Sequence, residues 1–124
     1  MNLVDSSGWL EFFTDGPLAS RYAEYLRDLE ELVTPTLVVF EVYKWIKRER
    51  SEEEALIAVA QLAKTRLVPL TTTLAVMAAD LSLDHGLAMA DAVVYATGLS
   101  HRAPVVTSDR DFAALPEVVF VERR

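Results

Sequence analysis

Short apolar segments alternate with longer helical ones along the whole chain, and this alternation is the strongest constraint on the fold. The apolar segments with strand character are residues 2–5, 33–36, 67–70, 104–107 and 118–121. Brief apolar strands that are separated by helices indicate a parallel sheet with helices on both of its faces. The pattern therefore predicts an α/β fold built on five parallel strands.

Helical periodicity fills the segments between these strands. Ser6 or Ser7 is expected to cap the first helix, Thr36 the third and Ser51 the fourth, where Ser51 and Glu54 also fit a capping box. The helices are expected at residues 6–13, from 18 to 32, at 36–49, at 51–65, at 72–85 before Gly86, around Asp91, and at 111–115. The predicted order is β-α-α-β-α-α-β-α-α-β-α-β.

Length and composition are those of one globular domain. Of the 124 residues, 52% are hydrophobic and 25% charged, so we expect a single domain over residues 1–124. The chain has no cysteine, which excludes disulfides and thiolate zinc sites. Its start lacks the basic region of a signal peptide, and the uncharged stretch 67–79 is too short to span a bilayer. A cytoplasmic protein without membrane contact is expected.

The net charge of −7 speaks against a nucleic-acid partner when it is taken alone, because phosphate binding depends on Lys and Arg. The objection holds only for acids that are spread evenly over the surface. If several acids gather around cations in one site, the net charge says little about that site.

Two acids follow predicted strands at the edge where ligands bind in such folds. Asp5 ends the first strand, and Asp109 comes directly after the fourth. Ligand crevices in open α/β sheets lie beyond the carboxyl ends of the strands, at the point where the strand order reverses. An order such as 3-2-1-4-5 would make the first and fourth strands neighbours and bring the two carboxylates together. Either acid alone could equally cap the helix that follows it.

Two further acids stand in unusual helical positions. Glu41 lies at the margin of an apolar helical stripe, and Asp91 is the only charge in the run GLAMADAVVYATGLS. Burial of an unpaired carboxylate is costly. As alternatives, Glu41 could pair with Lys44 or be solvated, and Asp91 could be a first-turn acid that the helix dipole favours.

Four acids brought to one place would need a cation. Two carboxylates ~4 Å apart repel each other by roughly 4 kcal/mol at an effective dielectric constant of about 20. Oxygen ligands without His or Cys select Mg²⁺ or Mn²⁺. Such ions mainly serve phosphoryl chemistry, in which they activate water and neutralise developing charge.

Four motifs in order resemble those of PIN-domain ribonucleases, specifically VapC-type toxins, over nearly the whole chain. They are VDSSGWLEFF at the start, VFEVYKW around Glu41, MADAVVYATG around Asp91 and TSDRDF around Asp109. The resemblance implies a three-layer α/β/α fold with a parallel sheet of order 3-2-1-4-5. It also implies that Asp5, Glu41, Asp91 and Asp109 are catalytic, with Asp5, Asp91 and Asp109 binding Mg²⁺ or Mn²⁺. Ser6, Thr107 and Asp111 match supporting positions.

The implied activity is endoribonuclease cleavage by the toxin of a type II toxin–antitoxin pair, with a 3′-hydroxyl and a 5′-phosphate as products. The implied partners are an RNA substrate, a small antitoxin and a second copy of the chain. The segment KWIKRER, residues 44–50, could supply phosphate contacts near Glu41. Its cations could equally be a solvated helix end. Two helical regions are rich in aromatic and aliphatic residues, most of which are expected in the core. Those that are exposed would form a groove for an amphipathic antitoxin segment; the residues are Trp9, Phe12, Phe13, Tyr22 and Tyr25 in the first region and Val42, Tyr43, Trp45 and Ile46 in the second.

Two other classes of protein compete with this interpretation. A response-regulator receiver also carries acids at strand ends, but it needs a lysine after its last strand, where this chain reads VFVERR. The second alternative is a catalytically inactive PIN-fold protein-interaction module. The intact set of acids argues against the inactive module.

Overall fold

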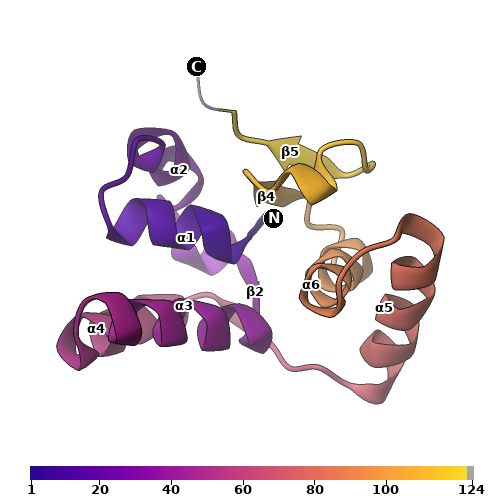
Figure 1. Ribbon diagram of the computed structural model, residues 1–124, viewed down its shortest axis with the longest axis horizontal. Helices are drawn as coiled ribbons and strands as arrows, with labels where there is room; N and C mark the ends of the chain where they lie inside the picture. Colours follow the sequence, from indigo (N-terminus) through magenta and orange to yellow (C-terminus); the bar gives the residue numbers. More distant parts are fainter. Residues whose placement is uncertain (123–124) are drawn as a thin grey trace.

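Five short parallel strands form the centre of the protein in a computed structural model that describes residues 1–122 (Figure 1). They are β1 (Leu3–Val4), β2 (Val33–Pro35), β3 (Arg66–Val68), β4 (Val105–Thr107) and β5 (Val118–Phe120). Hydrogen bonds join β1, β4 and β5 into one parallel unit and β2 and β3 into another. A parallel bridge between Asn2 and Leu32 connects the two units, so the strands run β3-β2-β1-β4-β5.

This order confirms the predicted 3-2-1-4-5 arrangement, with one difference. The sheet is not continuous, because only the Asn2–Leu32 bridge joins its two parts within the described residues. The reason is the length of β1, which has two residues before the chain turns into a helix at Ser6. The hydrogen bond from the Val33 N–H to the Asn2 carbonyl, at 3.0 Å, holds the two parts together.

Helices in three packed pairs surround the strands. They are α1 (Ser6–Phe13) with α2 (Ala19–Tyr25), α3 (Thr36–Glu49) with α4 (Glu52–Leu62), and α5 (Thr72–His85) with α6 (Met89–Ser100). The pair α1–α2 and the pair α5–α6 lie on opposite sides of β4 and β5, which confirms the predicted three-layer architecture (Figure 1). None of the helices within residues 1–122 is long and apolar enough to cross a lipid bilayer.

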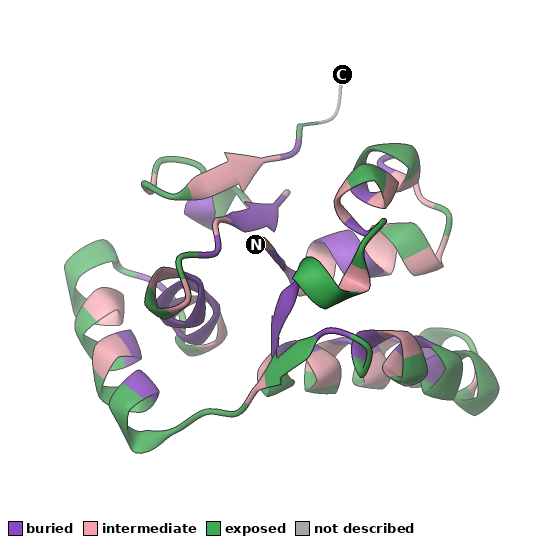
Figure 2. Ribbon diagram, turned by 180° about the vertical axis from the view of Figure 1, so that it is seen from behind, coloured by how far each residue is buried: buried purple, intermediate pink, exposed green. Residues whose placement is uncertain are grey.

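The apolar run around Asp91 is the central helix α6, which explains its composition. Every residue from Ala92 to Gly98 is buried (Figure 2). Gly98 lets this helix pack directly on the strand that follows, because a Cβ there would lie 2.8 Å from the Ala103 carbonyl oxygen. The burial of α6 fixes its first turn, which carries Asp91, beside the sheet.

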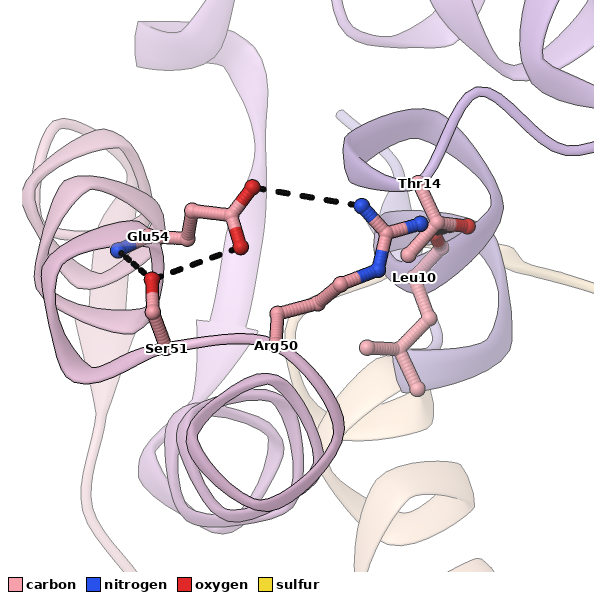
Figure 3. Close-up of polar contacts among 5 residues, drawn as sticks. All are labelled: Leu10, Thr14, Arg50, Ser51 and Glu54. Carbon is pink, nitrogen blue, oxygen red and sulfur yellow. Dashed lines mark hydrogen bonds and ion pairs between the residues drawn. The ribbon is translucent and has the colours of Figure 1, made fainter.

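Several helix ends differ from the expected ones. Asp5 precedes α1 and Pro35 precedes α3 as the capping residues, so Ser6, Ser7 and Thr36 are not N-caps. Ser51 does cap α4: its hydroxyl accepts the Glu54 N–H at 3.1 Å and lies 3.4 Å from the Glu54 carboxylate (Figure 3).

Three predicted helices are shorter than expected. The segment from residue 18 to residue 32 forms α2 and then a separate 3₁₀ turn, η1 (Leu29–Glu31), because Asp28 has an extended backbone conformation. The expected helix at 111–115 is a 3₁₀ turn, η2 (Arg110–Phe112), and α4 ends at Leu62 rather than near residue 65. The helix at 72–85 has the expected bounds and ends at Gly86, which adopts the left-handed conformation at φ 69°.

Candidate metal centre

The carboxyl ends of β1 and β4 place Asp5 and Asp109 at one edge of the sheet. The two strands pair in parallel, and the Asp5 N–H donates to the Val106 carbonyl at 3.0 Å. Asp109 follows β4 and begins η2, where its carboxylate accepts the Asp111 N–H at 2.9 Å. The neighbouring strands therefore bring together two acids that are far apart in the sequence.

Asp5 lies behind this edge, and only 5% of it is exposed. The Thr107 hydroxyl donates to its carboxylate at 2.9 Å, and the Ser7 hydroxyl donates to the same oxygen at 3.4 Å. Burial raises the pKa of Asp5, and the charge of Asp109 adds to the rise, whereas the Thr107 and Ser7 hydrogen bonds oppose it. Thr107 also accepts the Asp109 N–H at 3.0 Å, so one buried hydroxyl positions both acids.

The serine whose hydroxyl contacts Asp5 is Ser7, whereas Ser6, which the resemblance singled out, contacts Asp5 through a backbone hydrogen bond. Ser7 also accepts the N–H of Ser108 at 3.5 Å, and the Ser108 hydroxyl contacts the phenol of the buried Tyr22. Gly8 leaves room for the Tyr22 ring, because a side chain at position 8 would clash with that ring. Ser7 and Ser108 stand inside the quoted motifs, but nothing in the sequence indicates Tyr22.

The tightest group of acids is Asp91, Asp109 and Asp111, which offer oxygens within 4.8 Å of one another. Asp91 is half-buried in the first turn of α6, and Ala88 precedes this helix as its capping residue. Burial raises the pKa of Asp91 to about 7, and the charges of Asp109, Asp5, Asp111 and Glu41 add to the effect in that order. Asp111, expected only as a supporting acid, thus belongs to this group together with Asp91 and Asp109.

Glu41 lies in the second turn of α3, near enough to Asp5 for the two charges to interact. Burial raises the pKa of its carboxyl, the charge of Asp5 raises it further, and a hydrogen bond from Ser6 opposes the rise. Ser6 therefore contacts both acids, Glu41 through its side chain and Asp5 through its backbone. The ion pairs within residues 1–122 include neither Glu41 nor Lys44, so the alternative pairing of these two residues is wrong.

Arg110 follows Asp109 directly, but none of the ion pairs within residues 1–122 joins it to the acids. Its guanidinium lies over the ring of Phe120, 5.9 Å from the ring centroid. None of the ion pairs in the described part of the chain joins a lysine or arginine to any of these acids.

The donor set fits a hard divalent cation. Asp5, Glu41 and Asp91 all have raised pKa values, mainly through burial, and in each case the charge of a neighbouring carboxylate adds to the rise. Carboxylate oxygens alone, without imidazole or thiolate, favour Mg²⁺ or Mn²⁺ over zinc or copper. Asp91, Asp109 and Asp111 are close enough to share one ion, with Asp5 behind them.

Known proteins share this fold and this sequence pattern. The chain matches the PIN domain family over residues 3–118. A toxin–antitoxin complex from Klebsiella pneumoniae superposes with a TM-score of 0.81 at 22% identity, covering 96% of each chain. The sarcin–ricin loop cleaving toxin VapC20 of Mycobacterium tuberculosis gives 0.81 at 18%, covering 98% of each chain. DNA-bound VapBC from Salmonella typhimurium gives 0.74 at 13%, again covering 98% of each chain. At these identities the likeness shows a common fold. None of the curated protein sequences matches the chain significantly.

Proposed function

The chain belongs to the PIN domain family, and on that premise we propose that it is a metal-dependent endoribonuclease, the toxin of a type II toxin–antitoxin pair. The observation that carries the proposal is the cluster of Asp91, Asp109 and Asp111 at the carboxyl edge of the sheet, with Asp5 and Glu41 beside it. We propose that it acts in the cytoplasm, where it would meet both an RNA substrate and a small antitoxin.

We assign the metal to Asp5, Asp91 and Asp109, and the structure adds Asp111 to the candidates. Mg²⁺ or Mn²⁺ bound there would lower the pKa of a water that attacks the RNA phosphodiester in line and would neutralise the developing charge. Ionised carboxylates are needed for this role, so the raised pKa of Asp91 makes binding depend on pH in the acid range.

The remaining residues orient these ligands. Thr107 and Ser7 hold the Asp5 carboxylate through two hydroxyl donors, and Thr107 also fixes the backbone at Asp109. Glu41 completes the acidic set, directly or through water.

An antitoxin has a surface to occupy where α1, α3 and α4 meet. A cavity of about 200 Å³ lies there, lined by Phe13, Thr14, Ile46, Arg50, Glu54 and Ile57. Arg50 crosses from the end of α3 toward α1 and pairs with Glu54 at 3.9 Å (Figure 3). An amphipathic helix could place apolar side chains in this cavity. Trp9 and Tyr22, which the aromatic groove hypothesis included, are buried in the core.

A second copy of the chain would find an apolar face on the α5–α6 pair. This face exposes Val76, Leu83 and Met89, and an apolar cavity of about 280 Å³ lies beside Met89. Exposed apolar patches of this kind mark protein interfaces. We therefore propose that the protein is a homodimer.

The proposed activity is tested with purified protein and a panel of RNAs. Cleavage should require Mg²⁺ or Mn²⁺, stop in EDTA, and leave a 5′-phosphate. Asp109→Asn should abolish it with the fold kept, whereas Asp80→Asn, an exposed acid on α5, should leave it unchanged. Cleavage that persists in EDTA or in Asp109→Asn would contradict the proposal, and a folded protein inert on every RNA would favour the interaction module.

A further inference from the structure

Five aromatic and cationic side chains share one face of α3. They are Phe40, Tyr43, Lys44, Lys47 and Arg48, which we call the α3 stripe. Their spacing of three and four residues puts them on one side of the helix over about 12 Å. The opposite side holds the buried Val38, Val42 and Ile46. The stripe is therefore the solvent face of a well-anchored helix.

The α3 stripe leads directly away from the acidic cluster. Ser6, Leu10, Phe40, Glu41, Lys44, Trp45 and Arg48 line a hollow of about 300 Å³. The five residues of the stripe line a second hollow of about 470 Å³, which shares Phe40, Lys44 and Arg48 with the first. Glu41 lines the first hollow. Among the described residues, no carboxylate lines the second hollow.

A lysine lies over each of the two aromatic rings of the α3 stripe. Phe40 is 58% exposed, although it is a large apolar side chain. The Lys44 Nζ lies 5.5 Å from the Phe40 ring centroid, and the Lys47 Nζ lies 5.4 Å from that of Tyr43. Exposed aromatic platforms interleaved with cations are what single-stranded nucleic acids bind, through base stacking and phosphate contacts.

The cations of the stripe are available for phosphates. Lys44 belongs to none of the ion pairs within residues 1–122. Lys47 and Arg48 pair with Glu52 at 3.6 Å and Glu49 at 2.9 Å, but these pairs are exposed. Exposed ion pairs add little to stability, so either cation can exchange its carboxylate for a phosphate at low cost.

We propose that the α3 stripe binds the single strand of RNA that flanks the cleaved bond, with a base stacked on Phe40 and a phosphate on Lys44. The inference rests on the proposed ribonuclease function. Charge complementarity selects this occupant, because a chain of net charge −7 concentrates three cations here next to its acidic site. A protein partner has the apolar cavity at Phe13 and Ile57 instead.

The test is fluorescence anisotropy with an unstructured oligoribonucleotide in EDTA, where cleavage is prevented. Phe40→Leu should weaken binding about tenfold or more, and Phe40→Trp should retain it, because stacking needs an aromatic face. Lys44→Gln should reduce the slope of log affinity against log salt by about 0.7, the value for one phosphate of a single strand. The matched controls are Phe12→Leu and Lys64→Gln, which replace an exposed aromatic and an exposed cation elsewhere and should bind like wild type.

The kinetic readout separates this inference from the ribonuclease function. With Mg²⁺, Phe40→Leu should raise KM and leave kcat nearly unchanged, as expected for lost uniform binding. Stripe variants that bind and cleave RNA like wild type would overturn the inference while the ribonuclease function stands. Unchanged RNA affinity with weakened antitoxin binding would also overturn it. A wild-type protein that cleaves no RNA would instead contradict the ribonuclease function, and the affinities would still decide the role of the stripe.

Discussion

At the scale of single residues, the site depends on buried hydroxyl groups as much as on acids. Thr107 is fully buried, donates to Asp5 at 2.9 Å and accepts the Asp109 N–H at 3.0 Å. Removing a buried hydrogen-bonding group leaves its partners unsatisfied, which costs about 1–3 kcal/mol. The two acids would also lose their common support.

We therefore expect Thr107→Val to lower the free energy of unfolding by about 1–3 kcal/mol and to raise the pKa of Asp5 further, since the Thr107 hydrogen bond now opposes that rise. Urea denaturation measures the first effect, and cleavage rates should fall as well. Thr107→Ser, which restores the hydroxyl, should recover most of both losses. A valine variant as stable and as active as wild type would show that the hydroxyl is not needed.

Asp91 makes the metal-free protein sensitive to pH. Its pKa rises from 3.8 to about 7 on folding, mainly through burial and then through Asp109. The folded state therefore holds more protons than the unfolded state in this window, and stability falls as the pH rises through it. Asp91→Asn has no proton to lose and should lack this part of the decline.

Urea unfolding in EDTA at about pH 5 and about pH 8 measures the difference between the two proteins. The pKa values of Asp5 and Glu41 are raised as well. Because wild type and variant both contain these two acids, the difference between the two proteins reports on Asp91. An equal decline in wild type and variant would mean that Asp91 is already ionised at low pH.

The sequence predicted these acids better than the groups that hold them. Asp5 and Asp109 could be found because they follow apolar strands, and strand ends converge in a parallel sheet. Ser7 and Tyr22 contact Ser108, which is 101 and 86 residues away along the chain. Such contacts depend on the angle at which helices pack on the sheet, and residue spacing does not encode that angle.

At the scale of elements, α6 packs so closely on its surroundings that a larger side chain at Gly98 would clash. Gly98 sits where a Cβ would approach the Ala103 carbonyl oxygen to 2.8 Å. Alanine has the higher helix propensity, but a backbone atom cannot easily move aside. The close approach of α6 to the chain before β4 therefore outweighs propensity at this position.

We expect Gly98→Ala to destabilise the protein by about 1–3 kcal/mol, the usual cost of overpacking. Thermal or urea unfolding would show it. Gly86→Ala is the comparison, since this exposed glycine has no neighbour within 4 Å and only its φ of 69° is unfavourable for alanine. A Gly98→Ala protein that is as stable as wild type would mean that α6 can shift away from the strand.

Element types followed from periodicity, whereas element ends often did not. The helix Thr72–His85 and the Ser51 cap agree with the sequence pattern, because local hydrogen bonds and the Gly86 conformation determine them. The starts of α1 and α3 do not, because Asp5 points its carboxylate at Thr107, and Pro35 lies in β2. Tertiary contacts therefore determine which residues cap α1 and α3.

At the scale of the whole molecule, strand order links the fold to the site. With β1 beside β4, the two strand ends meet at one edge, and Glu41 of α3 and Asp91 of α6 lie near enough for their charges to interact with the acids there. The order followed from the family resemblance and not from any local pattern, since short strands carry little pairing information. That residues 1–124 form a single domain stays a prediction, and the family match spans residues 3–118.

The same scale explains how an acidic protein could act on RNA. A net charge of −7 gives the average surface the wrong sign for a polyanion. The acids with raised pKa values gather at one site, where a divalent cation would offset them, and the exposed cations of α3 begin beside it. Local arrangement, rather than net charge, determines what this surface can bind.

Melting curves of wild type and Asp91→Asn, each recorded with Mg²⁺ and with EDTA, show whether the acidic cluster binds a divalent metal. Mg²⁺ at ten times its dissociation constant should stabilise wild type by roughly 1.4 kcal/mol, a shift of a few degrees for a domain of this size. In EDTA, Asp91→Asn should be at least as stable as wild type, because it lacks one of the repelling charges. The variant should lose most of the Mg²⁺-induced shift together with RNA cleavage. A variant that keeps the full shift and cleaves RNA normally would contradict the account and show that Asp91 serves the helix alone.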